Sequence, residues 1–149
     1  MLKDCLKITG AVSIKLFDAD GAVKDERDIH NLVVASGKTF IAASMLKTTS
    51  NSPAAMSHLA IGAGSAAATS GDTALGSELG RSALATATSS ANVTTYTATF
   101  PAGVGTGAIT EAGIFNASSS GTLLCRTVFA VVNKGSLDAM SITWTITVS

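Results

Sequence analysis

The chain has 149 residues, of which ten are basic and ten are acidic, so its formal net charge at neutral pH is zero. Without excess positive charge it has no means of neutralising a nucleic-acid backbone or of binding an anionic bilayer, which excludes nucleic acid and membrane as expected partners. Charged residues make up 13% of the chain, about half of their usual share in globular domains. Such a neutral surface favours a protein that packs against neighbours, so we expect assembly.

The length fits one domain over residues 1–149, large enough to bury a core without staples. The opening MLKDCLKITG lacks the apolar centre of a signal peptide, and no run approaches about 18 apolar residues. Cys5 and Cys125 stand far apart without metal-ligand spacing, which predicts neither a zinc site nor a disulfide scaffold. We therefore expect a soluble protein that is made inside the cell.

The first third of the chain predicts a hairpin followed by a helix. AVSIKLF at 11–17 alternates apolar and polar residues, and the turn cluster DADG separates it from a second extended run ending in IHNLVV. The segment SGKTFIAASMLKT then has apolar residues at helical spacing, which predicts one short helix near residues 37–47 with Ser36 as its N-cap. Residues 1–9 are either an ordinary first strand or an arm that adds to a partner's sheet edge.

The remainder of the chain is typical of β-structure. Turn signals such as PAGVGTG, SSSG and NKGS separate short alternating runs. The last run, SITWTITVS, places Ile142, Trp144 and Ile146 on one face and hydroxyl residues on the other. This spacing predicts a mainly β fold, a single antiparallel β-sandwich of jelly-roll type. The other expected strands are the runs MSHLAIGAG, SALATAT, VTTYTATF, ITEAGIFNA and TLLCRTVFAVV.

A glycine-rich segment after the run LAI has the spacing G-x-G-x-x-A, at Gly62, Gly64 and Ala67. In a dinucleotide site this spacing opens a helix and is followed by an acidic residue on a second parallel strand. Here the next residues are a poor helix opener, and the acidic Asp72 and Glu78 lie within the loop itself. We expect no nucleotide cofactor, and interpret the segment as a flexible loop of small residues that lies at a subunit contact.

The chain offers little for catalysis or metal binding. His30 and His58 have no metal-ligand spacing, and no G-x-S-x-G sequence is present. The acidic residues at 25, 26 and 28 alternate with basic ones, which indicates a solvated face. We expect no catalytic residue, no cofactor and no metal.

Two single charges stand among apolar and small residues, Arg81 and Glu111. An unpaired buried ion costs several kcal/mol, so a charge in such surroundings is usually paired when it is buried. We therefore expect Arg81 and Glu111 to have structural partners.

Several segments, in their order and spacing, resemble a group of small structural proteins of tailed bacteriophages, described as capsid decoration or tail-fibre-like proteins. The resemblance extends from about His30 to Val148 and implies architectural roles for its matching positions, with glycines that permit positive φ and a tryptophan that fills the core. The matching positions are Asn31, Gly37, Gly62, Gly64, Leu75, Arg81, Glu111, Gly113, Lys134 and Trp144. The segments that carry the resemblance are HNLVVASGKTFIAASML, LAIGAG, DTALGSELGR, ITEAGIF, GTLLCRTVFA and SITWTITV.

What this resemblance implies is a virion protein without catalytic residues. A fibre needs a shaft or a receptor-binding tip, so a one-domain chain favours a cement protein that is made in the host cytoplasm and bridges major capsid protein subunits on the outer capsid surface. It would also associate with itself, as a dimer or trimer. One alternative is a tail-fibre or baseplate-associated module that binds a host surface glycan. Another is a small hydrolase, which would need a pocket that gathers Glu111 with a histidine.

Overall fold

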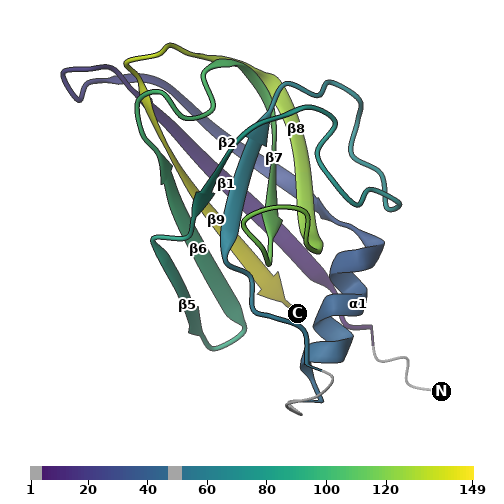
Figure 1. Ribbon diagram of the computed structural model, residues 1–149. Helices are drawn as coiled ribbons and strands as arrows, with labels where there is room; N and C mark the ends of the chain where they lie inside the picture. The colour runs from purple at the N-terminus through teal and green to yellow at the C-terminus, as the bar shows by residue number, and fades with distance from the viewer. Residues whose placement is uncertain (1–4, 47–51) are drawn as a thin grey trace.

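The computed structural model describes residues 5–46 and 52–149 of the chain. This part contains nine strands and one helix (Figure 1). All paired strands run antiparallel. The predicted mainly β, antiparallel architecture with one helix is therefore confirmed. In chain order the elements are β1 (Ile8–Phe17), β2 (Val23–Val33), α1 (Ala35–Ser44), β3 (His58–Gly62), β4 (Glu78–Ala83), β5 (Thr86–Ser90), β6 (Val93–Phe100), β7 (Gly107–Phe115), β8 (Leu123–Lys134) and β9 (Ala139–Val148).

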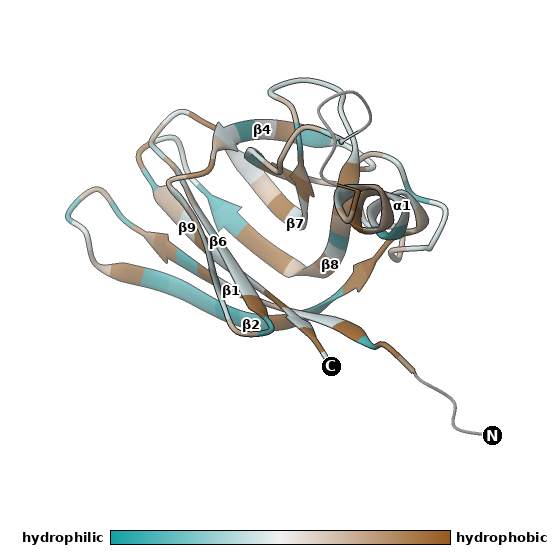
Figure 2. Ribbon diagram, turned by 90° about the horizontal axis from the view of Figure 1, so that it is seen from below, coloured by the Kyte–Doolittle hydropathy of each residue, from teal (hydrophilic) through white to brown (hydrophobic). Residues whose placement is uncertain are grey.

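The strands form one hydrogen-bonded order, β4-β3-β7-β8-β2-β1-β9-β6-β5, which curls into a half-barrel. Figure 2 shows its two halves facing each other, with β4, β7 and β8 on one side and β1, β2, β9 and β6 on the other. The halves are joined through β2, which pairs along most of its length with β1 and only at Leu32 and Val33 with β8. The sheet is therefore continuous at β2, where it passes from one half to the other, and we call this place a corner.

A second corner lies on the opposite side of the half-barrel. Strands β4 and β5 stand at the two ends of the strand order, yet only Leu84 and Ala85 separate them in sequence. The Leu84 N–H donates to the Ser57 carbonyl and the Ala85 N–H to the Thr97 carbonyl, each at 2.8 Å. The predicted single run SALATAT is therefore wrong, because the chain turns at this point from one half of the sheet to the other.

The main core lies between the two halves. Alternate residues of β1 and β9 point inward, and Trp144 is the largest side chain that is fully buried there. A smaller apolar cluster lies on the outer side of β3, β7 and β8, where Leu75 packs on Ala60, Phe115 and Leu123. The half of the sheet that contains β7 is therefore covered on both faces.

The helix α1 runs from Ala35 to Ser44 and packs on β8. The predicted span of 37–47 began too late, and its last residue lies outside the described residues. The N-cap is Val34 and not Ser36, whose hydroxyl donates to the Leu123 carbonyl at 2.8 Å. The N-cap prediction is wrong because the Ser36 side chain attaches the first turn of the helix to β8 instead of closing the turn itself.

Hydrogen bonds define the two ends of β1. At its far end Asp18 accepts hydrogen bonds from the Asp20 and Ala22 N–H groups, each at 2.9 Å, which closes the predicted hairpin. At its beginning, Lys7 and Ser149 exchange backbone hydrogen bonds of 2.6 and 2.8 Å, so β1 is an ordinary first strand from here on. Residues 1–4 of the alternative N-terminal arm lie outside the described residues.

Candidate functional site

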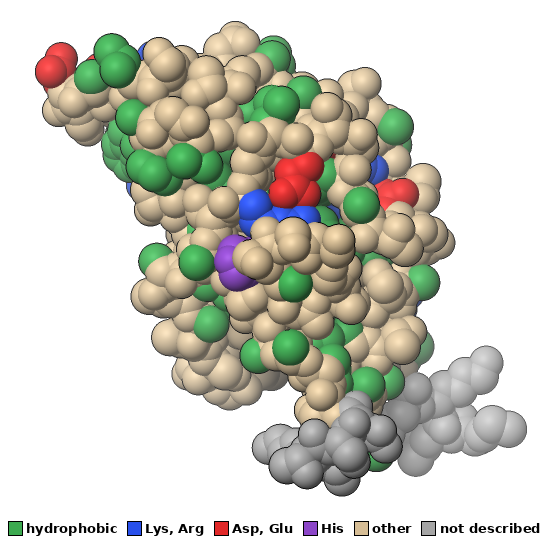
Figure 3. All heavy atoms as spheres, viewed as in Figure 1, with side chains coloured by type: hydrophobic (Ala, Val, Ile, Leu, Met, Phe, Trp, Pro, Cys, Tyr) green, Lys and Arg blue, Asp and Glu red, His purple; other side chains and the backbone are tan. Residues whose placement is uncertain are grey.

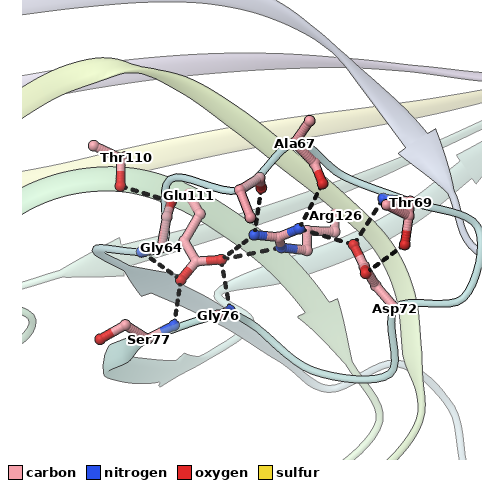
Figure 4. Close-up of polar contacts among 10 residues, drawn as sticks. Gly64, Ala67, Thr69, Asp72, Gly76, Ser77, Thr110, Glu111 and Arg126 are labelled. Carbon is pink, nitrogen blue, oxygen red and sulfur yellow. Dashed lines mark hydrogen bonds and ion pairs between the residues drawn. The ribbon is translucent and has the colours of Figure 1, made fainter.

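A buried ion pair lies on the outer face of β7 and β8, away from the main core. Glu111 is 0% exposed and Arg126 is 3% exposed. The Arg126 Nε and Nη2 atoms both donate to Glu111 Oε2, at 3.0 and 2.9 Å (Figure 4). The register of β7 shifts between Ile109 and Glu111. A bulge of this kind changes which face the following side chains occupy, and it allows Ile109 to join the core while Glu111 points out of it.

The segment 63–77 passes over Glu111 and binds its carboxylate through backbone N–H groups. The Gly64 and Ser77 N–H groups donate to Oε1 at 2.8 and 2.7 Å, and the Gly76 N–H donates to Oε2 at 2.9 Å. One carboxylate thereby joins the beginning and the end of the loop. We call this segment with Glu111 and Arg126 the clamped loop.

Arg126 fixes the middle of the clamped loop. Its Nη1 donates to Asp72 Oδ2 at 2.8 Å, and its Nη2 donates to the Ala66 carbonyl at 3.0 Å. Asp72 in turn accepts hydrogen bonds from the Thr69 N–H and hydroxyl, at 2.9 and 2.7 Å. The loop is therefore attached to the sheet at its start, middle and end, and the prediction of a flexible loop does not fit this hydrogen bonding.

Glycine is required at 62 and 64 because of close approach, not because of positive φ. A Cβ atom on Gly64 would lie 2.4 Å from Glu111 Oε1, and one on Gly62 would lie 2.4 Å from the Ser77 carbonyl oxygen. Neither residue is among the positive-φ glycines. The expected role of positive φ at these two glycines is thus corrected. The glycine-rich turn does bind an anion, but the anion is the carboxylate of Glu111 in the same chain.

The hydrogen bonds determine the charge states in the clamped loop. Burial alone would raise the pKa of Glu111, but the N–H groups of Ser77 and Gly76, together with Arg126, hold that pKa below its ordinary value. The N–H and hydroxyl of Thr69, with Arg126, hold the pKa of Asp72 low. The two carboxylates and the guanidinium of Arg126 therefore carry their charges at neutral pH, and all three are engaged in hydrogen bonds within the clamped loop.

Arg81 lies on the outer side of β4, and Glu111 lies two strands further along the sheet, in β7. It forms a two-point ion pair with Glu78, with Nε–Oε1 and Nη2–Oε2 distances of 2.8 and 2.7 Å. Its Nη1 donates to the Ala117 and Ser120 carbonyls at 2.9 Å each, and its guanidinium lies 3.8 Å from the centroid of the Phe115 ring. Arg81 thus connects β4 to the turn after β7. Figure 3 shows basic and acidic side chains meeting on a face with few other charges.

Trp144 lies in the main core between the two halves, where it is fully buried. Its Nε1–H donates to Asn31 Oδ1 at 3.0 Å, which links β9 to β2. The neighbouring Cys125 thiol is buried, and this burial raises its pKa to about 12. Cys125 is therefore a structural thiol in a dry environment, whereas Cys5 is exposed.

A second buried cation, Lys134, lies near the end of β8. Its Nζ donates to the carbonyls of Asp138 and Pro101, at 2.7 and 3.0 Å. The Asp138 carboxylate binds Lys24 at 2.8 Å and accepts the Gly135 N–H at 2.7 Å. These contacts close the turn between β8 and β9, and they are structural in the same sense as the clamped loop.

Neither histidine ring is bonded to the buried charges, although His30 lines the same surface hollow as Arg126. His58 Nδ1 lies 2.8 Å from the Ser57 hydroxyl, and His30 is exposed on β2. Neither ring bonds to Glu111. Among residues 5–46 and 52–149, no three His, Cys, Asp or Glu side chains are grouped as a metal site would require. In the same part of the chain, no helix has the length and apolar character to span a bilayer.

Sequence reasoning identified Glu111 but not its partner. Arg126 is a single charge inside the apolar run TLLCRTVFAVV, the same signal that drew attention to Glu111 and Arg81. The alternation of that run predicts a strand and does not by itself assign a role to Arg126. The signal that finds it is an ionic residue at a strand position that is otherwise apolar, which requires a partner of opposite charge nearby.

Comparison of the chain with protein-family models, with curated proteins and with solved structures finds no match.

Proposed function

We propose that this chain is a non-enzymatic structural protein of a bacteriophage particle, a cement protein that binds major capsid protein subunits on the outer surface of the head. The observation that carries the proposal is a neutral outer face on β9, β6 and β5. Its positions alternate with the inward residues of the core, all of them except Val93 and Ala139 carry hydroxyl groups, and we call the hydroxyl-bearing positions the hydroxyl face. They are Ser141, Thr143, Thr145 and Thr147 of β9, Thr95, Thr97 and Thr99 of β6, and Thr86, Thr88 and Ser90 of β5.

A face of this kind suits binding at many equivalent positions. Threonine presents both a methyl and a hydroxyl group, so it can pack and hydrogen-bond without bringing a charge that must be neutralised. Individual contacts of this type are modest, but their effects add when the same contact recurs around a closed shell. The proposed partners are the major capsid protein and further copies of this chain.

The internal chemistry favours this proposal over the two alternatives. The Glu111 and Arg126 side chains are engaged in holding the clamped loop, which argues against a hydrolase built on Glu111. A glycan-binding tail module stacks sugars on exposed aromatic rings, but Trp144 is fully buried and Tyr96 packs against the core.

The assignment of the fold to jelly-roll-like sandwiches is also a proposal. It is supported by the two corners at which the chain passes between the halves of the sheet.

Electron microscopy of purified particles that carry the chain tests the location. We expect extra density on the head, and density only on the tail would contradict the proposal in favour of the attachment module.

Binding to undecorated heads tests whether the hydroxyl face is the contact. Thr143→Lys should weaken this binding at least tenfold. Ser119→Lys, in an exposed turn away from the hydroxyl face, is the matched control. Equal binding by both variants would exclude the hydroxyl face as the contact.

A further inference from the structure

The outer edge of β5 is an unprotected strand edge. Strand β5 pairs with β6 on one side and stands at the end of the strand order on the other. All five of its residues are exposed. An edge strand leaves a row of backbone N–H and C=O groups without partners, so it can pair with a further strand.

Proteins usually block such edges with a charge, a proline or a bulge, and β5 has none of these three features. Its sequence TATSS contains no charge and no proline. Its pairing with β6 runs from Thr86↔Thr97 to Ser90↔Val93 without a bulge that would twist the edge away. Three of the five positions lie on the hydroxyl face, where Thr86 already bonds to Thr97. The edge is thus regular, neutral and formed of small residues that fit a pleated sheet.

We propose that β5 pairs antiparallel with β5 of a second copy, about a two-fold axis at Thr88. In that register Thr88 faces Thr88 of the second copy, Ala87 faces Ser89 and Thr86 faces Ser90. Only small neutral side chains meet, so the edge is complementary to itself, as a two-fold interface requires. Residues opposite each other share a face, and the hydroxyl faces of the two copies therefore join into one wider surface.

This inference deepens the proposed function, because it names the edge through which copies of a cement protein associate. Five residue pairs bury less than the roughly 1,200 Å² of a stable interface, so the pairing is weak in dilute solution and gains strength when copies are held together on a lattice. The test uses purified protein without particles, which keeps its outcome separate from the imaging of heads and tails.

Sedimentation at high protein concentration tests the interface. The unmodified chain should form dimers reversibly. Thr88→Lys and Thr88→Glu should each lower the association constant at least tenfold, since like charges then meet on the two-fold axis. An equimolar mixture of the two variants should restore association, because lysine then faces glutamate. Ser119→Lys should associate like the unmodified chain.

Cross-linking provides a second readout of the register. In a Cys5→Ser background, Thr88→Cys should form disulfide-linked dimers, since opposite residues of antiparallel strands are about 4.5–5.5 Å apart between Cα atoms. Ser119→Cys in the same background is the control and should form no disulfide-linked dimer. A chain that stays monomeric at all concentrations overturns the proposal, and so do dimers that T88K leaves intact.

Discussion

Residues 63–77 of the clamped loop and strand β5 have similar compositions but are held in place differently. Both segments are mostly exposed, and both consist largely of small residues such as alanine, serine and threonine. The loop is attached at three places to a buried ion pair, whereas β5 is held by backbone pairing along one side only. The difference shows that a stretch of small residues does not by itself indicate flexibility. The rigidity of such a segment depends on whether charged groups beneath it can bind its backbone.

The substitution with the largest expected effect is Glu111→Gln, which breaks the support of the loop. It leaves Arg126 buried with only part of its compensating charge, and we expect a loss of roughly 3–5 kcal/mol in the free energy of unfolding. Chemical denaturation measures this loss. Glu26→Gln is the control, because its pair with Lys15 has an N–O distance of 3.7 Å and is about half exposed, so it should cost at most about 1 kcal/mol. Equal losses in the two variants would contradict the account.

Gly64→Ala should have the next largest effect. The added Cβ would lie 2.4 Å from Glu111 Oε1, so the loop or the carboxylate must move. We expect a loss of about 1–3 kcal/mol, typical of overpacking at a buried contact. Gly71→Ala is in the same loop with nothing within 4 Å of its added Cβ, and it should change stability by less than about 0.5 kcal/mol. A mobile loop would tolerate both substitutions alike.

Acid should weaken the clamped loop. The pKa values of Glu111 and Asp72 are lower in the folded protein than in the unfolded chain, so the unfolded chain binds more protons as the pH falls. Their stabilisation is present above the unfolded pKa values, about 4, and is lost as the pH falls through the folded values. Denaturation curves between pH 7 and pH 2 should show this decline in the unmodified chain and a shallower one in E111Q. Parallel declines would remove Glu111 as a source of the effect.

The smallest effect is expected on β5. Thr86→Ala removes the hydroxyl contact with Thr97 on an exposed face, and cross-strand pairs of this type contribute about 0.2–1 kcal/mol. Thermal unfolding of the isolated protein at low concentration should therefore be almost unchanged. A large loss would mean that β5 supports the fold as strongly as the clamped loop does, and the contrast between the two regions would disappear.

Much of the sheet could be predicted from alternation alone, because a half-buried strand repeats every two residues. The last strand illustrates this, with Trp144 inside and threonines outside. The lone charge of Arg126 is visible in the sequence, but its pairing with Glu111 could not be predicted in this way. It depends on the bulge after Ile109 and on the register that brings β8 beside β7, and neither leaves a local pattern. The corner at Leu84 was missed for the same reason, since the residues on both sides favour strands.

Hydrogen exchange of three amides tests most directly the claim that the buried pair holds the loop. The N–H groups of Gly64, Gly76 and Ser77 donate to the Glu111 carboxylate although they belong to no helix and to no strand pairing. We predict that they exchange slowly in the unmodified chain and much faster in E111Q, by more than the change at core amides of β1 and β9. Rapid exchange of all three in the unmodified chain would contradict the account.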